Sequence, residues 1–304
     1  MITVNGKERK NKTMKKIGIA GLGTMGFAIA SNLLNRGYEV YGYDINPART
    51  ELLKNKGGHA AESCADLGGK VDTVISMVFS PDNLRDTLLG KNGLIETFPQ
   101  GGTIVVTASM GPKIIAEVEP ALARKGVKIL DAPVMADFND AEAGRMHVIV
   151  SGEPSLIEGK KELLNDMSSE LYIVGDKPGM AQAGKMCLQD LFCLTFEAGY
   201  ETITLARKYD LNISEMLRLF RDSPASSVML GMAADYGLKR EFRDTYSPMS
   251  ILNKDVHIAV DMARDVNIPV PASEGTAGVF QKAYDRWPDE DVWSGIKIIE
   301  NDPI

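Results

Sequence analysis

The stretch KKIGIAGLGTMGFAIASNLLNRGYEVYGYD, residues 15–44, decides the fold of this chain. Its short apolar run at 17–20 predicts a strand buried on both faces of a parallel sheet, and a glycine-rich turn follows at once. Apolar residues then recur at helical spacing up to Gly37, and residues 38–43 alternate into a second strand that Asp44 closes. Strand, turn, helix, strand and acid in this order predict a unit that binds a dinucleotide cofactor.

The turn has the glycine spacing that a pyrophosphate site requires. Gly21 can supply the tight turn, Gly23 removes a side chain where phosphates approach the backbone, and Gly26 lets the helix pack close to the strand. Free N–H groups and the helix dipole converge at this end of the helix and favour an anion. The residues expected to contact the cofactor here are Gly21, Leu22, Gly23, Thr24, Met25 and Gly26.

Asp44 lies where the acid that binds the adenosine ribose is expected. A carboxylate there accepts hydrogen bonds from the ribose hydroxyls and repels a 2′-phosphate, which favours NAD over NADP. Arg49 argues the other way, because a nearby arginine can bind that phosphate. No basic residue directly follows Asp44, so we expect NAD, with NADP as the less favoured cofactor.

The alternation of strands and helices continues to about residue 177. We expect further strands at 73–79, 103–106, 127–130, 147–151 and 171–174, and helices at 47–56, 84–89 and 112–125. Breaker residues cluster at 175–179, and the later patterns are helical. We therefore predict an α/β fold, with a doubly wound Rossmann domain that binds NAD at 15–178 and an all-α domain for substrate and dimerisation at 179–304. Residues 1–14 are expected to form a disordered leader.

Length, composition and charge exclude several classes of protein. The chain has 304 residues, 44% of them hydrophobic, and a net charge of −7, which indicates an acidic globular protein and argues against a nucleic-acid partner. No window approaches the roughly 18 continuous apolar residues of a membrane span, and the basic N-terminus lacks the apolar core of a secretory signal. The three cysteines and three histidines are scattered, so we expect reduced thiols, no metal site and a cytoplasmic location.

A helical pattern from 180 to 208 is expected to pack in a homodimer as well as in its own domain. Its apolar stripe consists of Ala183, Cys187, Leu191, Leu194 and Ala198. This stripe and the apolar positions around it exceed what one domain face needs, so we expect a homo-oligomer, either a dimer or a tetramer.

Four separated motifs together resemble the β-hydroxyacid dehydrogenase family, which includes 3-hydroxyisobutyrate dehydrogenase, tartronate semialdehyde reductase and L-threonate dehydrogenase. The family's cofactor signature appears as GLGTMGFAIASNL at 21–33, and its substrate-loop signature as DAPVMAD at 131–137 followed by DAEAG at 140–144. Its catalytic signature appears as GMAQAGKMCLQ at 179–189, and its late signature as KDVHIA at 254–259. The resemblance covers essentially residues 15–285.

By this resemblance Lys185 is the catalytic residue. Its ammonium can hydrogen-bond the reacting oxygen and pass a proton while a hydride moves to or from the nicotinamide, provided that partial burial lowers its pKa. Gln189 lies four residues on, on the same helix face, and can bind a substrate carboxylate or hydroxyl. Packing of its amide is the alternative interpretation.

The remaining cofactor contacts are expected from separate parts of the chain. Lys254 is expected to close over the cofactor, and a charge pair with Asp255 on a solvated helix face is the alternative. Met77, Val78 and Ser109 complete the expected set.

The substrate loop departs from the family pattern. Where the family has Ser-Gly-Gly, this chain has Met135, Ala136 and Asp137, which we take as the substrate-binding positions. Met135 cannot make the serine's side-chain hydrogen bond, although backbone N–H groups there can still bind a carboxylate. Asp137 either repels that carboxylate or caps the helix that follows. A further departure is Phe79, where the family usually has proline.

We predict an oxidoreductase that transfers a hydride between NAD(H) and a small β-hydroxy acid or its semialdehyde. A four-carbon sugar acid is favoured, because the glutamine after the lysine resembles the threonate branch of the family. A non-catalytic dinucleotide-binding or sensor protein is one alternative; the altered loop supports it, and the retention of Lys185, Lys254 and Asp44 opposes it. An imine reductase of the same architecture is the other alternative, and Lys185 weighs against it.

Overall fold

The computed structural model describes residues 15–245 and 247–301, so the leader predicted at 1–14 lies outside the described residues. The chain divides into two compact units. The first holds the chain up to Ala108 together with Lys113–Met180, and the second holds Ser109–Pro112 together with the chain from Ala181 onward. The short segment Ser109–Pro112 therefore belongs to the second unit, although in sequence it interrupts the first.

A nine-stranded sheet forms the centre of the first unit. Its strands are β1 (Lys16–Ala20), β2 (Glu39–Tyr43), β3 (His59–Ala60), β4 (Thr73–Ser76), β5 (Thr103–Val106), β6 (Lys128–Asp131), β7 (Val134–Met135), β8 (Met146–Ser151) and β9 (Ser168–Gly175). They lie in the order β3-β2-β1-β4-β5-β6-β8-β7, and β9 pairs with β8. The neighbours from β3 to β6 are parallel, whereas β8 is antiparallel to β6 and β7. The strand order reverses between β1 and β4, and sheets of this kind bind ligands beyond the carboxyl ends of the strands at such a point.

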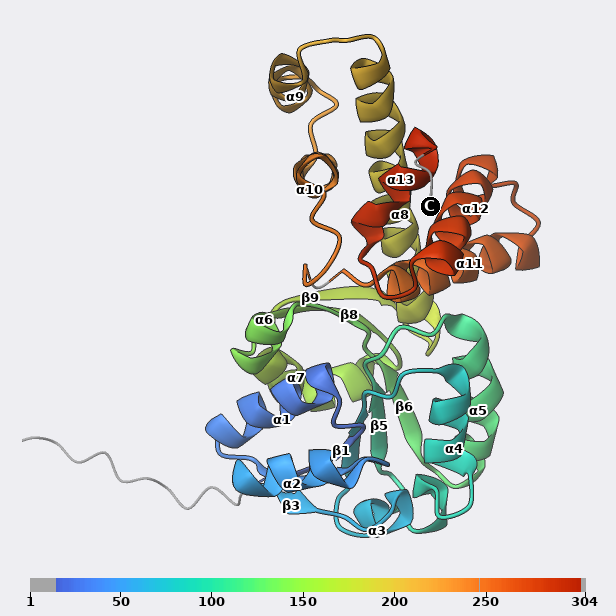
Figure 1. The fold of residues 1–304 in the computed structure, drawn as a ribbon. Coiled ribbons are helices and arrows are strands. Elements are labelled where there is room, and N and C mark those ends of the chain that lie inside the picture. Colours follow the sequence, from blue (N-terminus) through green and yellow to red (C-terminus); the bar gives the residue numbers. More distant parts are fainter. Residues whose placement is uncertain (1–14, 246, 302–304) are drawn as a thin grey trace, which may run out of the picture. The chain divides into compact units, whose positions relative to one another are not determined.

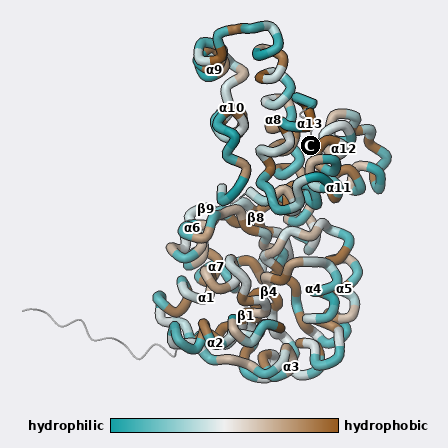
Figure 2. Tube along the Cα trace, viewed as in Figure 1, coloured by the Kyte–Doolittle hydropathy of each residue, from teal (hydrophilic) through white to brown (hydrophobic). Residues whose placement is uncertain are grey.

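Helices cover both faces of this sheet. They are α1 (Thr24–Asn35), α2 (Pro47–Asn55), α3 (Cys64–Gly68), α4 (Pro81–Leu89), α5 (Pro112–Arg124), α6 (Phe138–Glu142) and α7 (Pro154–Met167), with a 3-10 turn η1 (Leu94–Glu96). Figure 1 shows α1 and α7 on one side of the strands and α4 and α5 on the other. Ile19, Ile29 and Leu164 belong to one buried cluster that joins β1, α1 and α7, and Figure 2 shows the hydrophobic colour along the strands around β4.

The predicted fold class is confirmed, with a doubly wound Rossmann unit followed by a helical unit. The strand predicted at 73–79 is wrong in length, because β4 ends at Ser76. The hydroxyl of Ser80 accepts a hydrogen bond from the N–H of Asn83 at 3.1 Å and caps α4, whose first residue is Pro81. The chain therefore has to leave the sheet before residue 80.

The second unit consists of helices joined by loops. They are α8 (Met180–Lys208), α9 (Ile213–Asp222), α10 (Val228–Lys239), α11 (Met249–Asp265), α12 (Pro271–Arg286) and α13 (Gly295–Glu300), with a 3-10 turn η2 (Val292–Ser294). The core gathers around Tyr200 and Trp293, both fully buried. The Tyr200 hydroxyl donates to the carbonyl oxygen of Val292 at 2.9 Å, so the buried phenol keeps a hydrogen bond.

The predicted apolar stripe of α8 is not the face that packs into this core. Leu191 and Leu205 are each 59% exposed, and Cys187 and Ala198 are exposed on the same side of the helix. α8 buries its opposite side, which carries Cys193, Phe196, Tyr200 and Ile203. In the part of the chain that the structure describes, α8 thus has a second apolar face that nothing covers.

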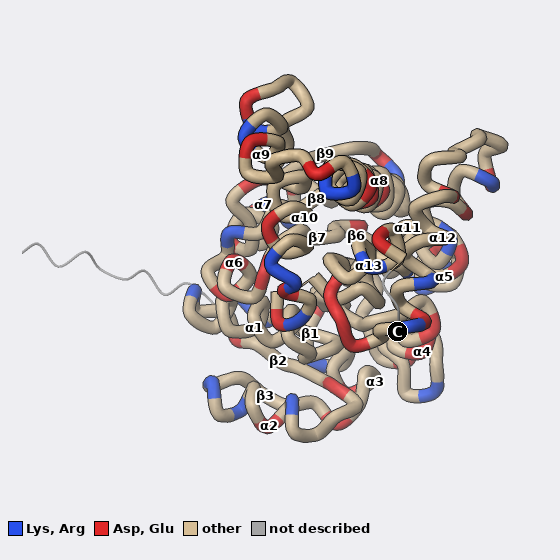
Figure 3. The backbone as a smooth tube through the Cα atoms, turned by 45° about the horizontal axis from the view of Figure 1, so that its top comes forward, with Lys and Arg blue, Asp and Glu red and all other residues tan. Residues whose placement is uncertain are grey.

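Charged side chains are spread over both units, and Figure 3 shows the two signs interspersed along the chain. The three cysteines are free thiols. Within residues 15–245 and 247–301, three or more His, Cys, Asp or Glu side chains are nowhere grouped so as to hold a metal ion. Over the same residues, no helix has both the length and the apolar character needed to cross a membrane.

Candidate active site

The glycine-rich turn between β1 and α1 is tight on one side and open on the other. Gly21 has a φ of 89°, a left-handed conformation that favours glycine. A Cβ on Gly26 would lie 1.9 Å from the carbonyl oxygen of Gly21, so a larger residue cannot fit there. Beside Gly23, in contrast, nothing lies within 4 Å of the place a Cβ would take. A phosphate can therefore approach the backbone at Gly23, where the N–H groups of α1 begin.

The Asp44 carboxylate is held in place by two backbone N–H groups. The N–H of Leu22 donates to Oδ2 at 2.7 Å, and the N–H of Asn46 donates to Oδ1 at 2.8 Å. Each carboxylate oxygen has a further lone pair, which can accept a hydrogen bond from a ribose hydroxyl. The acid and the turn thus have the geometry that a dinucleotide requires.

A pocket of about 590 Å³ lies beyond the carboxyl ends of β1, β2 and β4. The residues predicted for the cofactor that line it are Gly21, Gly23, Asp44, Met77 and Val78. Lining residues that the sequence does not predict include Ile45, Glu62, Phe79, Asp86 and Lys91. Ile45 and Phe79 directly follow Asp44 and Val78 in sequence, so their position one residue beyond a predicted contact was the signal that could have identified them.

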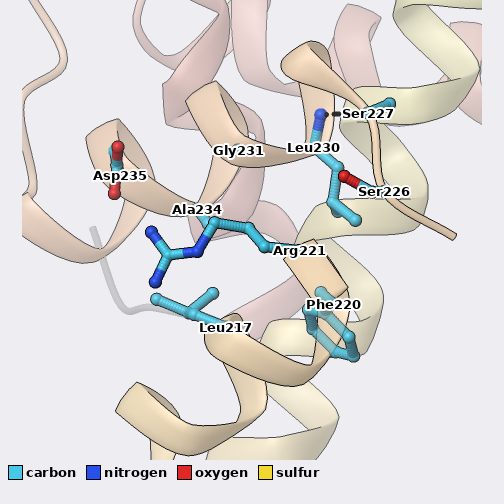
Figure 4. A pocket seen from close by; sticks show the side chains of 9 residues that line it. All are labelled: Leu217, Phe220, Arg221, Ser226, Ser227, Leu230, Gly231, Ala234 and Asp235. Carbon is cyan, nitrogen blue, oxygen red and sulfur yellow. Dashed lines mark hydrogen bonds between the residues drawn. The ribbon is translucent and has the colours of Figure 1, made fainter. Parts of the chain in front are cut away.

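Two other pockets fit a dinucleotide less well. One of about 860 Å³ lies where β1 and β4 begin, at the edge of the sheet opposite to the one that binds ligands in such folds. The other lies between α9 and α10 and holds about 100 Å³, far below the roughly 300–1,000 Å³ of small-molecule sites. In Figure 4 the side chain of Arg221 extends beside that of Leu217, and the hydroxyl of Ser227 accepts the N–H of Leu230, at 3.0 Å, as the cap of α10.

In the second unit, four side chains form one continuous series of hydrogen bonds. Lys185 Nζ donates to Gln189 Oε1 at 3.1 Å, and Gln189 Nε2 donates to Asp255 Oδ2 at 2.8 Å. Lys254 Nζ donates to the other carboxylate oxygen, Oδ1, at 2.6 Å. The charge pair of Lys254 and Asp255 is therefore present, but Asp255 is only 1% exposed and does not lie on a solvated face. α8 supplies the first two residues and α11 the other two.

Burial lowers the pKa of Lys185 to about 8, from an ordinary value of 10.5. The side chain is 5% exposed, and the loss of hydration disfavours the ammonium form. The negative charge of Asp255 acts in the opposite direction and the positive charge of Lys254 acts with burial. Near pH 8 both the amine and the ammonium are populated, so Lys185 can both accept and give a proton.

The segment that begins at Ser109 is tied to the helical unit by two side chains. Gln182 Oε1 accepts hydrogen bonds from the N–H groups of Met110 and Gly111, at 2.8 and 3.2 Å. Lys254 Nζ donates to the carbonyl oxygen of Ser109 at 2.8 Å. Ser109 and Lys254, both predicted to contact the cofactor, therefore contact each other. Gln182 was not predicted, although it lies within the catalytic signature and is fully buried.

The altered substrate loop lies in the first unit, at β7 and the start of α6. Asp137 is the N-cap of α6, and its Oδ1 accepts the N–H of Asp140 at 2.8 Å. Of the two alternatives for this carboxylate, the structure therefore shows the capping role. Met135 pairs with His147 of β8 in antiparallel register, and Met135 and Ala136 are both half-buried.

Known protein families match both units of the chain. Residues 16–175 match the NAD binding domain of 6-phosphogluconate dehydrogenase. Residues 179–299 match the NAD-binding domain of NADP-dependent 3-hydroxyisobutyrate dehydrogenase. The chain belongs to the β-hydroxyacid dehydrogenase family. The resemblance drawn from four short motifs is thereby confirmed over nearly the whole chain.

Individual members of the β-hydroxyacid dehydrogenase family and one neighbouring fold show how far the likeness extends. L-threonate dehydrogenase of Pectobacterium atrosepticum is 27% identical over 271 residues, which cover 88% of each chain. The crystal structure of 3-hydroxyisobutyrate dehydrogenase from Salmonella typhimurium has 26% identity and a TM-score of 0.80, and the match covers 93% of this chain and 99% of that one. An imine reductase variant from Myxococcus stipitatus has 19% identity and a TM-score of 0.64, over 95% of this chain and 100% of that one, which shows a shared fold alone. This β-hydroxyacid dehydrogenase family member is an oxidoreductase.

Proposed function

We propose that this oxidoreductase transfers a hydride between NAD(H) and a small β-hydroxy acid or its semialdehyde, with Lys185 as the catalytic acid and base. The observation that carries the proposal is the buried amine of Lys185, which donates to Gln189 and whose pKa is lowered to about 8. The open glycine turn and the fixed carboxylate of Asp44 support a dinucleotide site. When bound, the nicotinamide ring accepts or gives the hydride.

Lys185 provides the proton transfer that must accompany the hydride. In the direction of oxidation, the neutral amine accepts the proton of the substrate hydroxyl while the hydride leaves the carbon that bears it. In the direction of reduction, the ammonium returns that proton to the carbonyl oxygen. Hydride and proton together account for the two electrons and two hydrogens exchanged. The ammonium also stabilises negative charge that develops on the reacting oxygen.

NAD is the cofactor that we infer, with NADP less favoured. Three carboxylates, including that of Asp44, line the pocket together with one basic residue, Lys91. A 2′-phosphate would bring further negative charge against this acidic wall, whereas a ribose hydroxyl can donate to it. Ile45 and Phe79 are 86% and 67% exposed and offer apolar surface to the adenine ring.

The substrate-binding residues that we propose are Met135, Ala136 and Asp137. Gln189, which the sequence predicts with them, has its amide bonded to Lys185 and Asp255 instead. Met135 and Ala136 carry no hydroxyl, and the carboxylate of Asp137 caps α6, where its Oδ1 accepts the N–H of Asp140. We infer that the backbone N–H groups of this loop bind the substrate carboxylate. L-threonate dehydrogenases are among the relatives, and a four-carbon sugar acid is accordingly the first substrate to test.

We further propose that the protein is a homo-oligomer, a dimer or a tetramer. The second apolar face of α8, which includes Leu191 and Leu205, supports this proposal. Exposed apolar side chains grouped on one side of a helix can mark an interaction surface. A second copy of the chain would remove this apolar surface from water.

Two other functions are the alternatives to this proposal. A non-catalytic dinucleotide sensor is supported by the loss of Ser-Gly-Gly at Met135 and Ala136. An imine reductase is supported by the shared fold alone. The retention of Lys185 opposes both.

The decisive experiment is a panel of hydroxy acids, semialdehydes and cyclic imines with NAD(H) and NADP(H), followed by the absorbance of the reduced cofactor. We expect at least one hydroxy acid to be oxidised with NAD, and Lys185→Ala to lower that activity by a factor on the order of 10² to 10⁴. Lys208→Ala, at the exposed end of the same helix, is the control. Cofactor binding without turnover of any compound would favour the sensor, and reduction of imines alone would favour the imine reductase.

A further inference from the structure

We infer that Asp255 is a positioning residue for Lys185. Asp255 fixes the amide of Gln189 and, through that amide, the direction of the catalytic amine. The negative charge of Asp255 also acts on this amine. This inference rests on the proposed function, because it takes Lys185 as the group that moves the proton. It also revises the expectation for Gln189, whose amide is bonded to protein groups at both ends.

The amide of Gln189 fits between its two neighbours in only one orientation. The carboxylate of Asp255 only accepts hydrogen bonds, so it requires the Nε2 end of the amide. The Oε1 end is then left to face Lys185, as observed. The reverse orientation would set the Oε1 atom of the amide against the Asp255 carboxylate, two acceptors with no proton between them, which is unfavourable for buried groups.

This orientation has a consequence for the neutral form of Lys185. A neutral amine can accept as well as donate, so an unconstrained glutamine could turn its NH₂ group toward the amine and occupy the lone pair. Asp255 prevents that, because it holds the NH₂ group of Gln189 at 2.8 Å. Lys185 therefore has to donate an N–H to Gln189, and its lone pair stays available for the substrate proton.

Asp255 is itself firmly anchored. It is 1% exposed, and Lys254 donates to its Oδ1 at 2.6 Å while also donating to the carbonyl oxygen of Ser109 at 2.8 Å. A buried carboxylate with a charged partner keeps its direction, whereas a solvated one would not. A fixed group on α11 thus determines the position of the Lys185 amine on α8.

The charged groups that act on Lys185 among the described residues both come from α11. Asp255 favours the ammonium form, and Lys254 opposes it. On α8 itself, Gln182 and Gln189 flank the lysine with uncharged amides. If the charge of Asp255 were removed, burial and Lys254 would both lower the pKa of Lys185 without opposition.

The first test compares Asp255→Asn with Asp261→Asn, an exposed acid on the same helix. The protein is labelled with ¹³C at the lysine ε-carbons, Lys185→Met identifies the Lys185 signal, and its titration is followed by NMR. We expect the midpoint to move to lower pH in Asp255→Asn and to stay in place in Asp261→Asn. The acidic limb of kcat/KM for oxidation should move in the same direction. An unchanged or higher midpoint would overturn the electrostatic part of the inference.

The second test separates positioning from substrate binding. Gln189→Leu should lower kcat by about 10- to 100-fold, as expected for a misplaced catalytic group, and leave KM nearly unchanged. Above the pH of the acidic limb, a lower pKa of Lys185 no longer changes its protonation. There, adding Asp255→Asn to Gln189→Leu should cost little more in kcat, because the amide that links Asp255 to the amine is already absent. A raised KM with normal kcat, or independent losses in the double variant, would overturn the positioning role.

The two tests also distinguish this inference from the proposed function. The NMR titration needs no turnover. If the Lys185 midpoint moves as expected in a protein without dehydrogenase activity, the proposed function is rejected, but the effect of Asp255 on Lys185 stands. In the opposite case the enzyme is active and loses activity in Lys185→Ala, while Asp255→Asn changes neither the Lys185 titration nor the pH profile. That result would reject the inference and keep the proposed function.

Discussion

The backbone N–H of Leu22 donates to Oδ2 of Asp44 at 2.7 Å, so the glycine-rich turn and the acid at the end of β2 form one structure. They meet because β1 and β2 are parallel neighbours, with Ala20 opposite Tyr43 at their carboxyl ends. A change at Asp44 should therefore affect both the acid that we propose to bind the ribose and the turn that we propose to receive the phosphates. We therefore expect a substitution at Asp44 to change the binding of the ribose and of the phosphates together.

We expect the protein to bind NAD(H) more tightly than NADP(H), and Asp44→Ser to narrow or reverse that preference. The variant loses a charged acceptor for the ribose, which should weaken NAD binding by about 10- to 100-fold, and it loses the charge that repels a 2′-phosphate. Titration of both reduced cofactors by fluorescence measures this, with Glu51→Gln on the exposed side of α2 as the control. Equal or tighter binding of NADPH to the wild-type protein would show that a base such as Lys91 governs the site.

Lys185→Ala should leave cofactor binding nearly intact while lowering turnover by a factor on the order of 10² to 10⁴, as expected for the loss of a positioned acid–base group. Single-turnover kinetics on a verified substrate, beside a cofactor titration, separate these two effects. Ordinary turnover in this variant would contradict the assigned mechanism. A mechanism in which a group other than Lys185 supplies the proton would then be favoured.

The buried lysine should also reduce the stability of the fold at neutral pH. Its folded pKa of about 8 lies below the ordinary 10.5, so its favourable contribution is present above pH 10.5 and is lost as pH falls through 8. Lys185→Met should therefore raise the free energy of unfolding near pH 7 by about 1–3 kcal/mol, with a smaller gain at higher pH. Urea denaturation at several pH values measures this, and Lys208→Met provides an exposed comparison on the same helix. No gain at pH 7 would mean that the ammonium is well accommodated.

Much of the first unit could be predicted because its signals are local. The turn at Gly21, the strand before it and the acid after β2 each follow from a few neighbouring residues. The predicted end of β4 is wrong because the cap of α4 at Ser80 ends an apolar run that continues past Ser76. Local patterns thus located the strands better than they located their ends.

The hydrogen-bonded series in the second unit could be predicted only in part. Lys185 and Gln189 are one helical turn apart, so their contact follows from spacing. Asp255 lies 66 positions after Gln189, and no local pattern indicates that its carboxylate is buried and bonded to that amide. The same holds for Gln182, whose partners lie more than 70 positions earlier in the chain. Burial of polar groups depends on tertiary packing, and a single sequence carries little information about it.

The exposed apolar face of α8 predicts the effect of a charge placed on it. Leu191 is 59% exposed, so Leu191→Arg should leave the fold of a single chain intact but should oppose contact with a second copy. Light scattering at low micromolar concentration should show an oligomer for the wild-type protein and a smaller species for the variant. Leu52→Arg, at a site 45% exposed on α2, is the matched control. A monomeric wild-type protein would remove the proposed homo-oligomer.

The last prediction concerns Glu197 of α8, which is 8% exposed and whose Oε2 finds no hydrogen-bond partner among the described residues. Burial, with a smaller contribution from the charge of Glu201, raises the pKa of Glu197 to about 8, from 4.5. The folded state therefore holds this proton more tightly than the unfolded chain. The resulting stability is fully present below pH 4.5 and is lost as pH rises through 8.

Glu197→Gln keeps the shape of the side chain and removes its ionisation. Between about pH 5.5 and about pH 8.5, the free energy of unfolding of the wild-type protein should fall by on the order of 2–4 kcal/mol more than that of the variant. Urea denaturation at the two pH values measures the difference. Glu215→Gln, an exposed acid on α9, should behave like the wild-type protein because its environment changes little on unfolding. Parallel pH dependence in the wild-type protein and Glu197→Gln would show that Glu197 is ionised in the folded state, and that water or a movement of α8 reaches its carboxylate.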